Sequence, residues 1–142
     1  MKISEVMTKN VVSICGEDNI QKAAELMRDH DIGAIPVCSN DKVIGVITDR
    51  DIILRIVADK KDASKENVRS IMTSTPVVVT PDMDVSEATK IMSDKQIRRL
   101  PVVRDGKIVG IISLGDFAVE NGTNSSAGKA LSGISNPCCH EL

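Results

Sequence analysis

The segments Gly45–Asp51 and Gly110–Asp116 have the sequences Gly-Val-Ile-Thr-Asp-Arg-Asp and Gly-Ile-Ile-Ser-Leu-Gly-Asp. In both, a β-branched apolar pair precedes a hydroxyl residue, and an aspartate follows three positions after that hydroxyl. Shifting the sequence by 65 positions, the distance from Gly45 to Gly110, aligns 6–52 with 71–117 without a gap. An internal repeat of this length predicts two copies of one supersecondary unit that pack as a pair.

Each copy predicts the same order of elements. In the first copy, the apolar run Val11–Ile14 predicts a short strand, and apolar residues at helical spacing predict a helix over about Ile20–Asp29. Strands are expected at Ala34–Cys38 and Val43–Ile47, joined by a hairpin turn, with a last helix from about Asp49. The second copy repeats this order, with strands at Val77–Val79, Leu100–Val103 and Ile108–Ile112, a helix around Val85–Met92 and a last helix from about Leu114.

The two copies together predict a mixed α/β fold (α+β) of two βαββα repeats related by a pseudo-twofold axis. We expect 1–60 to form the first repeat, 61–120 the second, and 121–142 a polar C-terminal tail with a weak short helix over Ala127–Ile134. The charged stretch Asp59–Ser70 predicts a surface connection, with a short helix near Glu66–Met72. A chain of 142 residues is long enough to bury a proper core.

Composition narrows the classes of function. Phe117 is the only aromatic residue, and the net charge is −2 with acids and bases interspersed. This balance argues against a nucleic-acid partner, and the chain lacks the aromatic stacking platforms of single-strand binders. No apolar run is long enough to span a membrane, and the first residues show no signal region, so we expect a cytosolic protein without a membrane partner. Cys15 and Cys38 lie in or beside apolar runs, which predicts buried thiols.

The repeated Thr/Ser-x-x-Asp pattern supports two interpretations. It fits a helix capping box, in which the hydroxyl of Thr48 or Ser113 and the carboxylate of Asp51 or Asp116 satisfy backbone N–H groups. It also fits a ligand site, because a helix start favours phosphate and a carboxylate one turn later can accept hydrogen bonds from a ribose diol. The two interpretations are compatible in part.

A family resemblance rests on these motifs together. Ile32–Val37 and Ile97–Val102 share the pattern h-x-x-h-Pro-Val, where h is apolar, and each precedes a Gly-h-h-Thr/Ser-x-x-Asp ending. Both motifs, twice and in register, resemble the CBS (cystathionine-β-synthase) domain over about Ser4–Glu120. The resemblance implies a Bateman module, a regulatory pair of CBS repeats with two clefts. In this family the clefts often hold an adenine nucleotide or a related adenosyl ligand, such as AMP, ADP, ATP, NAD or S-adenosylmethionine.

The resemblance also implies which residues face each cleft. Its main cleft would place Asp116 on the ribose, Ser113 and an arginine on phosphate, and apolar strand edges around the adenine. The residues expected around this main cleft are Ser113, Asp116, Arg98, Arg99, Thr8, Val12, Gly33 and Ala34. Those expected around the mirror cleft, which lacks the arginine pair, are Thr48, Asp51, Arg50, Thr73 and Val77. The competing interpretation of Arg98 and Arg99 is a pair of solvated charges at a strand edge.

Several alternatives stay open. No catalytic set, metal site or cofactor motif is visible, so we expect a non-enzyme, either a nucleotide sensor or a protein-interaction scaffold with vestigial clefts. A thiol-based redox role for the Cys138-Cys139-His140 tail is a third hypothesis, whereas these adjacent residues lack the spacing of a structural zinc site. The apolar helices that follow each hairpin predict a homodimer. An effector protein is a further expected partner, and the sequence does not identify it.

Overall fold

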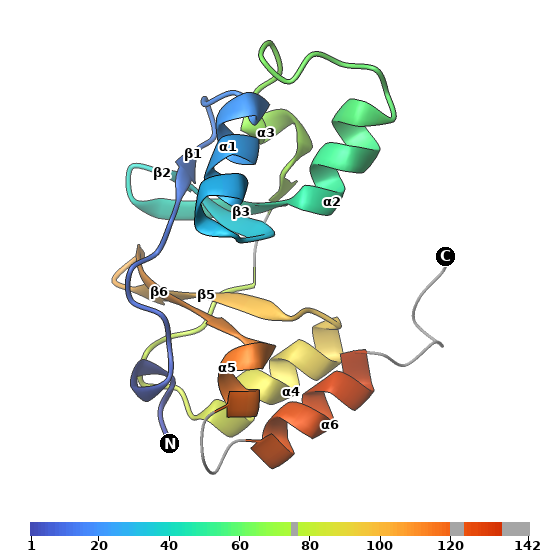
Figure 1. Cartoon of the computed structure of the whole chain (residues 1–142). Helices are drawn as coiled ribbons and strands as arrows, with labels where there is room; N and C mark the ends of the chain where they lie inside the picture. The colour runs from blue at the N-terminus through green and yellow to red at the C-terminus, as the bar shows by residue number, and fades with distance from the viewer. Residues whose placement is uncertain (75–76, 120–123, 135–142) are drawn as a thin grey trace. The chain divides into compact units, whose positions relative to one another are not determined.

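The computed structural model describes residues 1–74, 77–119 and 124–134. The chain forms two compact units (Figure 1). One, here called the continuous unit, comprises Val12–Pro76, and the other, the composite unit, comprises Met1–Val11 and Val77–Leu142. The mixed α/β fold class and its two repeats are confirmed, and each unit has its own hydrophobic core.

The continuous unit contains a four-stranded sheet in the order β1-β2-β3-β4. The strands β1 and β2 are parallel, whereas β2 with β3 and β3 with β4 are antiparallel. The strands are β1 (Ile14–Cys15), β2 (Ala34–Ser39), β3 (Lys42–Thr48) and β4 (Thr73–Ser74). The helices are α1 (Ile20–His30), α2 (Asp49–Ile52), its π-helical continuation η2 (Ile53–Val57) and α3 (Val68–Ile71).

The composite unit repeats this plan around the antiparallel pair β5 (Arg99–Arg104) and β6 (Lys107–Ser113). A parallel bridge from Val79 to Val102 replaces the first strand, and an antiparallel bridge from Thr8 to Ile111 replaces the fourth. The helices of this unit are η1 (Ile3–Glu5), α4 (Val85–Lys95), α5 (Leu114–Val119) and α6 (Asn124–Ile134).

Local sequence explains why the repeated elements begin and end where they do. The side chain of Asn19 accepts a hydrogen bond from the backbone N–H of Lys22 and caps α1, and Asp84 caps α4 in the same way through Ser86. Both hairpins turn through residues with positive φ. These turn residues are Asn40, Asp41, Asp105 and Gly106.

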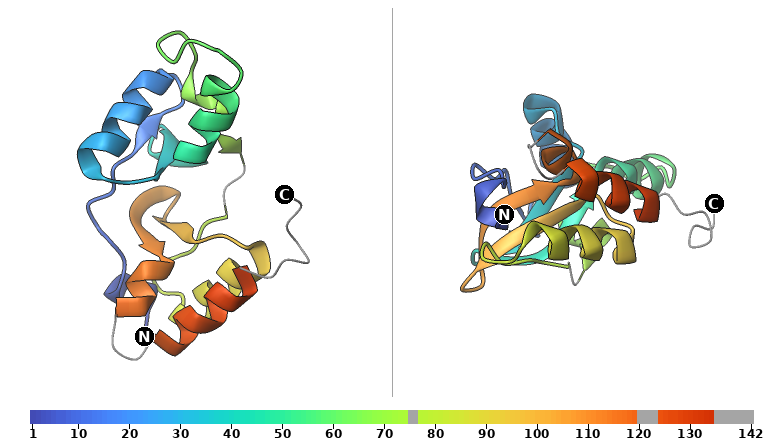
Figure 2. Two further views of the ribbon diagram at one scale, coloured as in Figure 1. Left: turned by 45° about the vertical axis from the view of Figure 1, so that its right-hand side comes forward. Right: turned by 90° about the horizontal axis from the view of Figure 1, so that it is seen from below.

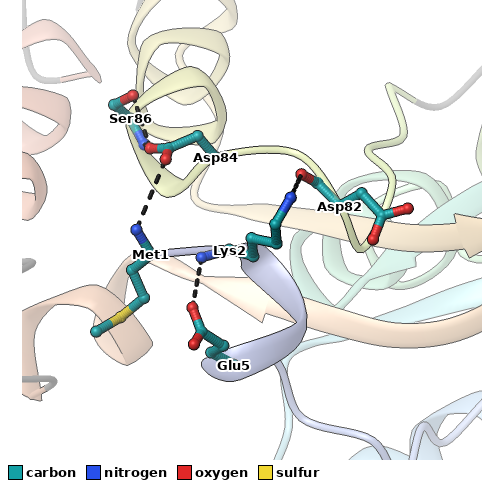
Figure 3. Close-up of polar contacts among 6 residues, drawn as sticks. All are labelled: Met1, Lys2, Glu5, Asp82, Asp84 and Ser86. Atoms are coloured by element: carbon teal, nitrogen blue, oxygen red, sulfur yellow. Dashed lines mark hydrogen bonds and ion pairs between the residues drawn. The ribbon is translucent and has the colours of Figure 1, made fainter.

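Each unit includes the chain segment that comes just before the repeat of the other unit in the sequence. In the composite unit, the N–H of Ile3 donates to the carbonyl of Met83 at 3.0 Å, and the N–H of Val85 donates to the carbonyl of Met1 at 3.0 Å. Around the same start of α4, the amine of Met1 lies 3.6 Å from a carboxylate oxygen of Asp84 (Figure 3). The side chain of Ile3 is fully buried in this core.

The continuous unit takes up 66–76 in the equivalent way. The N–H of Val68 donates to the carbonyl of Asp18 at 2.9 Å, and the Val68 side chain is fully buried, as Ile3 is in the other unit. The guanidinium of Arg55 on η2 donates to the carbonyl of Ile71 at 3.0 Å. These bonds hold the segment between the repeats against the first copy.

Two glycines make room for these crossing segments. A Cβ on Gly110 of β6 would lie 2.6 Å from the sulfur of Met7 and 3.0 Å from the carbonyl oxygen of Thr8. A Cβ on Gly45 of β3 would lie 2.6 Å from the carbonyl oxygen of Thr73. Neither position can carry a side chain without moving the backbone that passes over it.

The helix α6 packs into the composite unit beside α4 (Figures 1 and 2). Its side chains Ala127, Ala130 and Ile134 are buried in the same core as Phe117. The backbone approaches α4 closely, because a Cβ on Gly133 would overlap the side chain of Ser93. The weak helix expected in the tail is therefore an integral part of the core.

The structure corrects three expectations. Cys38 is buried, and burial raises the pKa of its thiol, but Cys15 is exposed. The reason is that β1 has only two residues, which point to opposite faces, and Ile14 takes the inward one. The first strand is correspondingly shorter than Val11–Ile14. Phe117 lies on the helix after the second hairpin, one of the two apolar helices expected to form a dimer interface, but it is fully buried in the composite core.

Within the described residues, no helix combines the length and the apolar character needed to cross a membrane.

The burial of Ile3 yields a stability prediction. Truncation of Ile3 to Ala leaves a cavity in the composite core and is expected to reduce the free energy of unfolding by about 2–5 kcal/mol. Val78→Ala is the control, because Val78 lies in the same unit with 42% of its surface exposed, and we expect a change within about 0.5 kcal/mol. Urea denaturation measures both. Equal midpoints for Ile3→Ala and the parent would show that the N-terminal segment does not belong to the folded core.

Candidate functional site

The repeated motif lies at the turn from a strand into a helix in both units. The N–H of Ser113 donates to Oδ2 of Asp116 at 2.8 Å, and the N–H of Asp116 donates to Oγ of Ser113 at 3.3 Å. The pair Thr48 and Asp51 forms the same reciprocal bonds, at 3.0 and 3.1 Å. Both motifs are therefore capping boxes, as the first of the two interpretations predicts.

Capping does not exhaust the acceptor capacity of the two aspartates. The bonds that described residues make to Asp51 and Asp116 use Oδ2 in each case. Both side chains are half-buried. A carboxylate oxygen has two lone pairs, so Oδ1 of each residue can accept hydrogen bonds from a ligand.

An arginine pair stands beside the turn in the composite unit. Arg99 is the β-sheet partner of Ser113, and the N–H of Leu114 donates to the carbonyl of Arg98 at 2.8 Å. Both arginine residues are exposed. The backbone therefore holds two cationic side chains next to the start of α5, a position that favours an anion.

The continuous unit has the same backbone with different side chains. The N–H of Asp49 donates to the carbonyl of Gly33 at 2.9 Å, and Ala34 is the sheet partner of Thr48. The carboxylate of Asp49 lies over Gly33, 3.0 Å from where a Cβ would stand, and accepts a bond from the N–H of Arg50. This turn thus carries an acid where the composite unit carries Leu114, and no base at the position of Arg98.

The turn in the composite unit borders a cavity of about 620 Å³. Its cationic side is formed by the arginine pair and its apolar side by α5 and α6. The lining residues are Arg98, Arg99, Ser113, Leu114, Gly115, Ala118, Ala127, Gly128 and Leu131. It is an open depression whose volume lies in the range of small-molecule sites, and its lining combines a few polar groups with apolar ones.

The structure brings together part of each expected residue set. Of the main cleft, the composite unit contains Ser113, Asp116, Arg98, Arg99 and Thr8, whereas Val12, Gly33 and Ala34 belong to the continuous unit. Of the mirror cleft, the continuous unit contains Thr48, Asp51, Arg50 and Thr73, whereas Val77 belongs to the composite unit.

Three of these residues have structural roles as well. The exposed residues Thr8 and Thr73 pair with β6 and β3 through their backbones, and Val77 packs half-buried against the composite core. Asp116 follows Gly115 but is not itself among the residues that line the cavity, because its carboxylate turns back toward the N–H of Ser113.

Sequence reasoning missed the contribution of α6. Ala127, Gly128 and Leu131 line the cavity although they lie in the segment expected to be a polar tail. The signal was present, because Ala127, Ala130 and Ile134 recur at helical spacing and are buried on one face. Two glycines in the segment, both poor helix formers, obscured it.

The described ranges contain no group of three or more His, Cys, Asp or Glu side chains that could hold a metal ion. The described residues do not include Cys138, Cys139 and His140. The redox role of the tail therefore stays a hypothesis.

Comparison with known proteins gives consistent matches to one family. A family model described as CBS domain matches residues 3–58 and 68–120. The CBS domain-containing protein YhcV of Bacillus subtilis is 41% identical over 138 residues, which cover 97% of this chain and 98% of that protein. That relative therefore consists almost wholly of the matched region.

Solved structures agree with the sequence matches. A CBS domain protein from Pyrobaculum aerophilum, complexed with AMP, has a TM-score of 0.80 and 25% identity, with 91% of this chain and 99% of that chain covered. A hexameric CBS-CP12 protein from bloom-forming cyanobacteria has a TM-score of 0.76 and 29% identity, with 88% of this chain and 73% of that chain covered.

The capping boxes yield a stability prediction. Ser113→Ala removes the acceptor for the N–H of Asp116 and is expected to reduce the free energy of unfolding, measured by chemical denaturation without ligand, by about 1 kcal/mol. Ser113→Thr is the matched control, because Thr48 caps the equivalent helix, and we expect it to stay close to the parent. If Ser113→Ala and Ser113→Thr have the same stability, the hydroxyl does not cap α5.

Proposed function

Because the chain belongs to the CBS domain family and carries two copies of the domain, we propose that it is a regulatory module that senses an adenine nucleotide or a related adenosyl ligand. The observation that carries the proposal is the cavity of the composite unit, where Arg98, Arg99 and Ser113 line one space with apolar side chains. The AMP complex of a similar CBS protein supports the class of ligand.

The chemistry of the cavity matches the two ends of a nucleotide. Arg98 and Arg99 present guanidinium groups, which bind phosphate oxygens through charge-assisted hydrogen bonds. The hydroxyl of Ser113 adds a donor for phosphate. Leu114 and Ala118 offer an apolar surface for the base. Asp116 does not line the cavity itself but follows Gly115, which does, and we assign its Oδ1 as an acceptor for the hydroxyls of a ribose that lies next to this turn.

The proposal gives the two units unequal roles. In the continuous unit, the carboxylate of Asp49 beside Gly33 repels an anion at the place where the composite unit attracts one. Arg50 offsets this charge in part. We therefore assign the tighter phosphate site to the composite unit, with the Thr48 and Asp51 turn as a weaker second site.

We infer a regulatory module without catalysis. The relative YhcV, whose name describes it as CBS domain-containing, supports this, because the match covers almost its whole length. We infer that the output passes to an effector protein or to a second copy of the chain. AMP, ADP, ATP, NAD and S-adenosylmethionine all contain the adenosyl group, and a thermal-shift series with these compounds ranks them.

An interaction scaffold with vestigial clefts and no nucleotide ligand is the second candidate function, and an exposed apolar surface supports an interface under either function. Ile53, Leu54 and Val57 on η2 are 56%, 49% and 61% exposed. Large apolar side chains clustered on one helix face indicate an interface. The occupant we propose is a second copy of the chain, in a homodimer, and the hexameric assembly of a similar CBS protein supports self-association.

The ligand proposal is tested by removing one charge. Asp116→Asn keeps the shape of the side chain but weakens its acceptor, so we expect a loss of about 1.5–3 kcal/mol in binding, or roughly ten- to a hundredfold in Kd for AMP. Asp51→Asn should have a smaller effect. Calorimetric titration with AMP and ATP measures both, and melting curves without ligand report the capping cost separately.

Asp105→Asn is the control for that experiment, because it removes the same charge from an exposed hairpin turn. If Asp51→Asn loses binding and Asp116→Asn does not, the ligand occupies the other turn. If both variants bind like the parent, the two aspartates act only as helix caps.

The dimer proposal is tested on η2. Leu54→Glu places a charge in the exposed apolar stripe and is expected to convert a dimer into a monomer in light scattering at micromolar concentration, because burying an unpaired carboxylate is costly. Asn40→Asp adds the same charge to an exposed turn and should leave the mass unchanged. A parent protein that is monomeric at high micromolar concentration contradicts the dimer.

A further inference from the structure

The helix α6 supplies a wall of the cavity that the family resemblance does not account for. The family model ends at residue 120, whereas α6 comprises Asn124–Ile134. Ala127, Gly128 and Leu131 line the cavity that the arginine pair also lines. The cavity of the composite unit is thus shared between the repeated fold and a helix outside the repeat.

Most of the residues that attach α6 to the unit are not the ones that line the cavity. Ala130 and Ile134 are buried in the core, and the backbone at Gly133 passes close to Ser93 of α4. The side-chain amide of Gln96 also donates to the carbonyl of Gly133 at 3.3 Å. Leu131, in contrast, is 49% exposed although it lines the cavity. One side of α6 packs against the core and α4, and the side that carries Leu131 remains available to contact a ligand.

Gly128 lines the cavity without a side chain of its own. A Cβ built on Gly128 meets no atom within 4 Å, so packing does not require a glycine there. Glycine is also among the least favourable residues in a helix interior. Gly128 lines the same space as Arg98 and Ser113, and a side chain at position 128 would have room there.

We propose that α6 is part of the ligand site and makes it sensitive to the apolar end of the ligand. This rests on the proposed function. The phosphate end binds Arg98 and Arg99, and the base lies against Leu131 in the space that Gly128 leaves open. A ligand that contacts both sides holds α6 on the unit, so binding and the docking of α6 stabilise each other.

The test fills the cavity without removing any proposed polar contact. Gly128→Leu places a side chain in open space on a helix that leucine favours, so the melting temperature without ligand is expected to equal or exceed that of the parent. The affinity for AMP, measured by calorimetry, is expected to fall at least about tenfold, because the side chain occupies the place of the ligand. Ser132→Leu is the matched control, at an exposed position of α6 outside the lining, and should bind AMP like the parent.

A second variant covers the case in which leucine at 128 disturbs the fold. Leu131→Ser changes an exposed side chain and should weaken AMP binding about three- to tenfold with little change in melting temperature. Hydrogen exchange of the parent should slow in 127–134 when AMP is added. Unchanged AMP affinity in Gly128→Leu or, where that variant does not fold, in Leu131→Ser would remove α6 from the site and leave the proposed function intact. A parent that binds none of the adenosyl compounds would overturn the proposed function and the role of α6 with it.

Discussion

The close passage of a crossing segment over a strand glycine is the constraint on which the rest of the structure depends. Met7 and Thr8 pass over Gly110, and Met72 and Thr73 pass over Gly45, at distances that exclude a Cβ. This contact lets the segment before each repeat complete the sheet of the opposite copy. It also brings Ile3 and Val68 into the cores. Without it, β3 and β6 would be edge strands with exposed backbone groups.

The same constraint fixes the two strand-to-helix turns. Thr73 and Thr8 pair with the residues just before the capping boxes, so the backbone of both turns is held by a sheet on one side and a helix on the other. The geometry is then nearly identical in the two copies, while the side chains differ. Arg98 and Leu114 stand where the other copy has Gly33 and Asp49. The two turns therefore share a backbone and differ in the charge of their side chains, and it is this difference that separates them as candidate sites.

The sequence predicts most regular elements well, because they follow local rules. The helix α1 and the strands of both hairpins agree with the apolar periodicity within one or two residues, and the turns at Asn40 and Gly106 follow from residues that tolerate positive φ. The prediction that Cys15 is buried was wrong, because the length of β1 is set by its pairing with β2 and not by its own composition.

Other features depend on distant contacts that periodicity does not reveal. The pairing of Thr8 with Ile111 joins residues from opposite ends of the chain, and nothing in the local sequence around Thr8 specifies its partner. The docking of α6 depends on the shape of α4 at Ser93. The candidate site could be predicted as far as Arg98, Arg99 and Ser113, which adjoin repeated motifs, but the wall around Gly128 has no counterpart in the first copy.

The discontinuity of the composite unit has a consequence for synthesis on the ribosome. The continuous unit, Val12–Pro76, has all its residues once position 76 has emerged, and it can fold while translation continues. The segment Met1–Val11, made before the continuous unit, must wait for β6 before its partner strand exists, a delay on the order of ten seconds at typical elongation rates. During that interval Ile3 and Met7 are exposed apolar side chains on a nascent chain, and early binding by a chaperone would protect them from association with neighbouring chains.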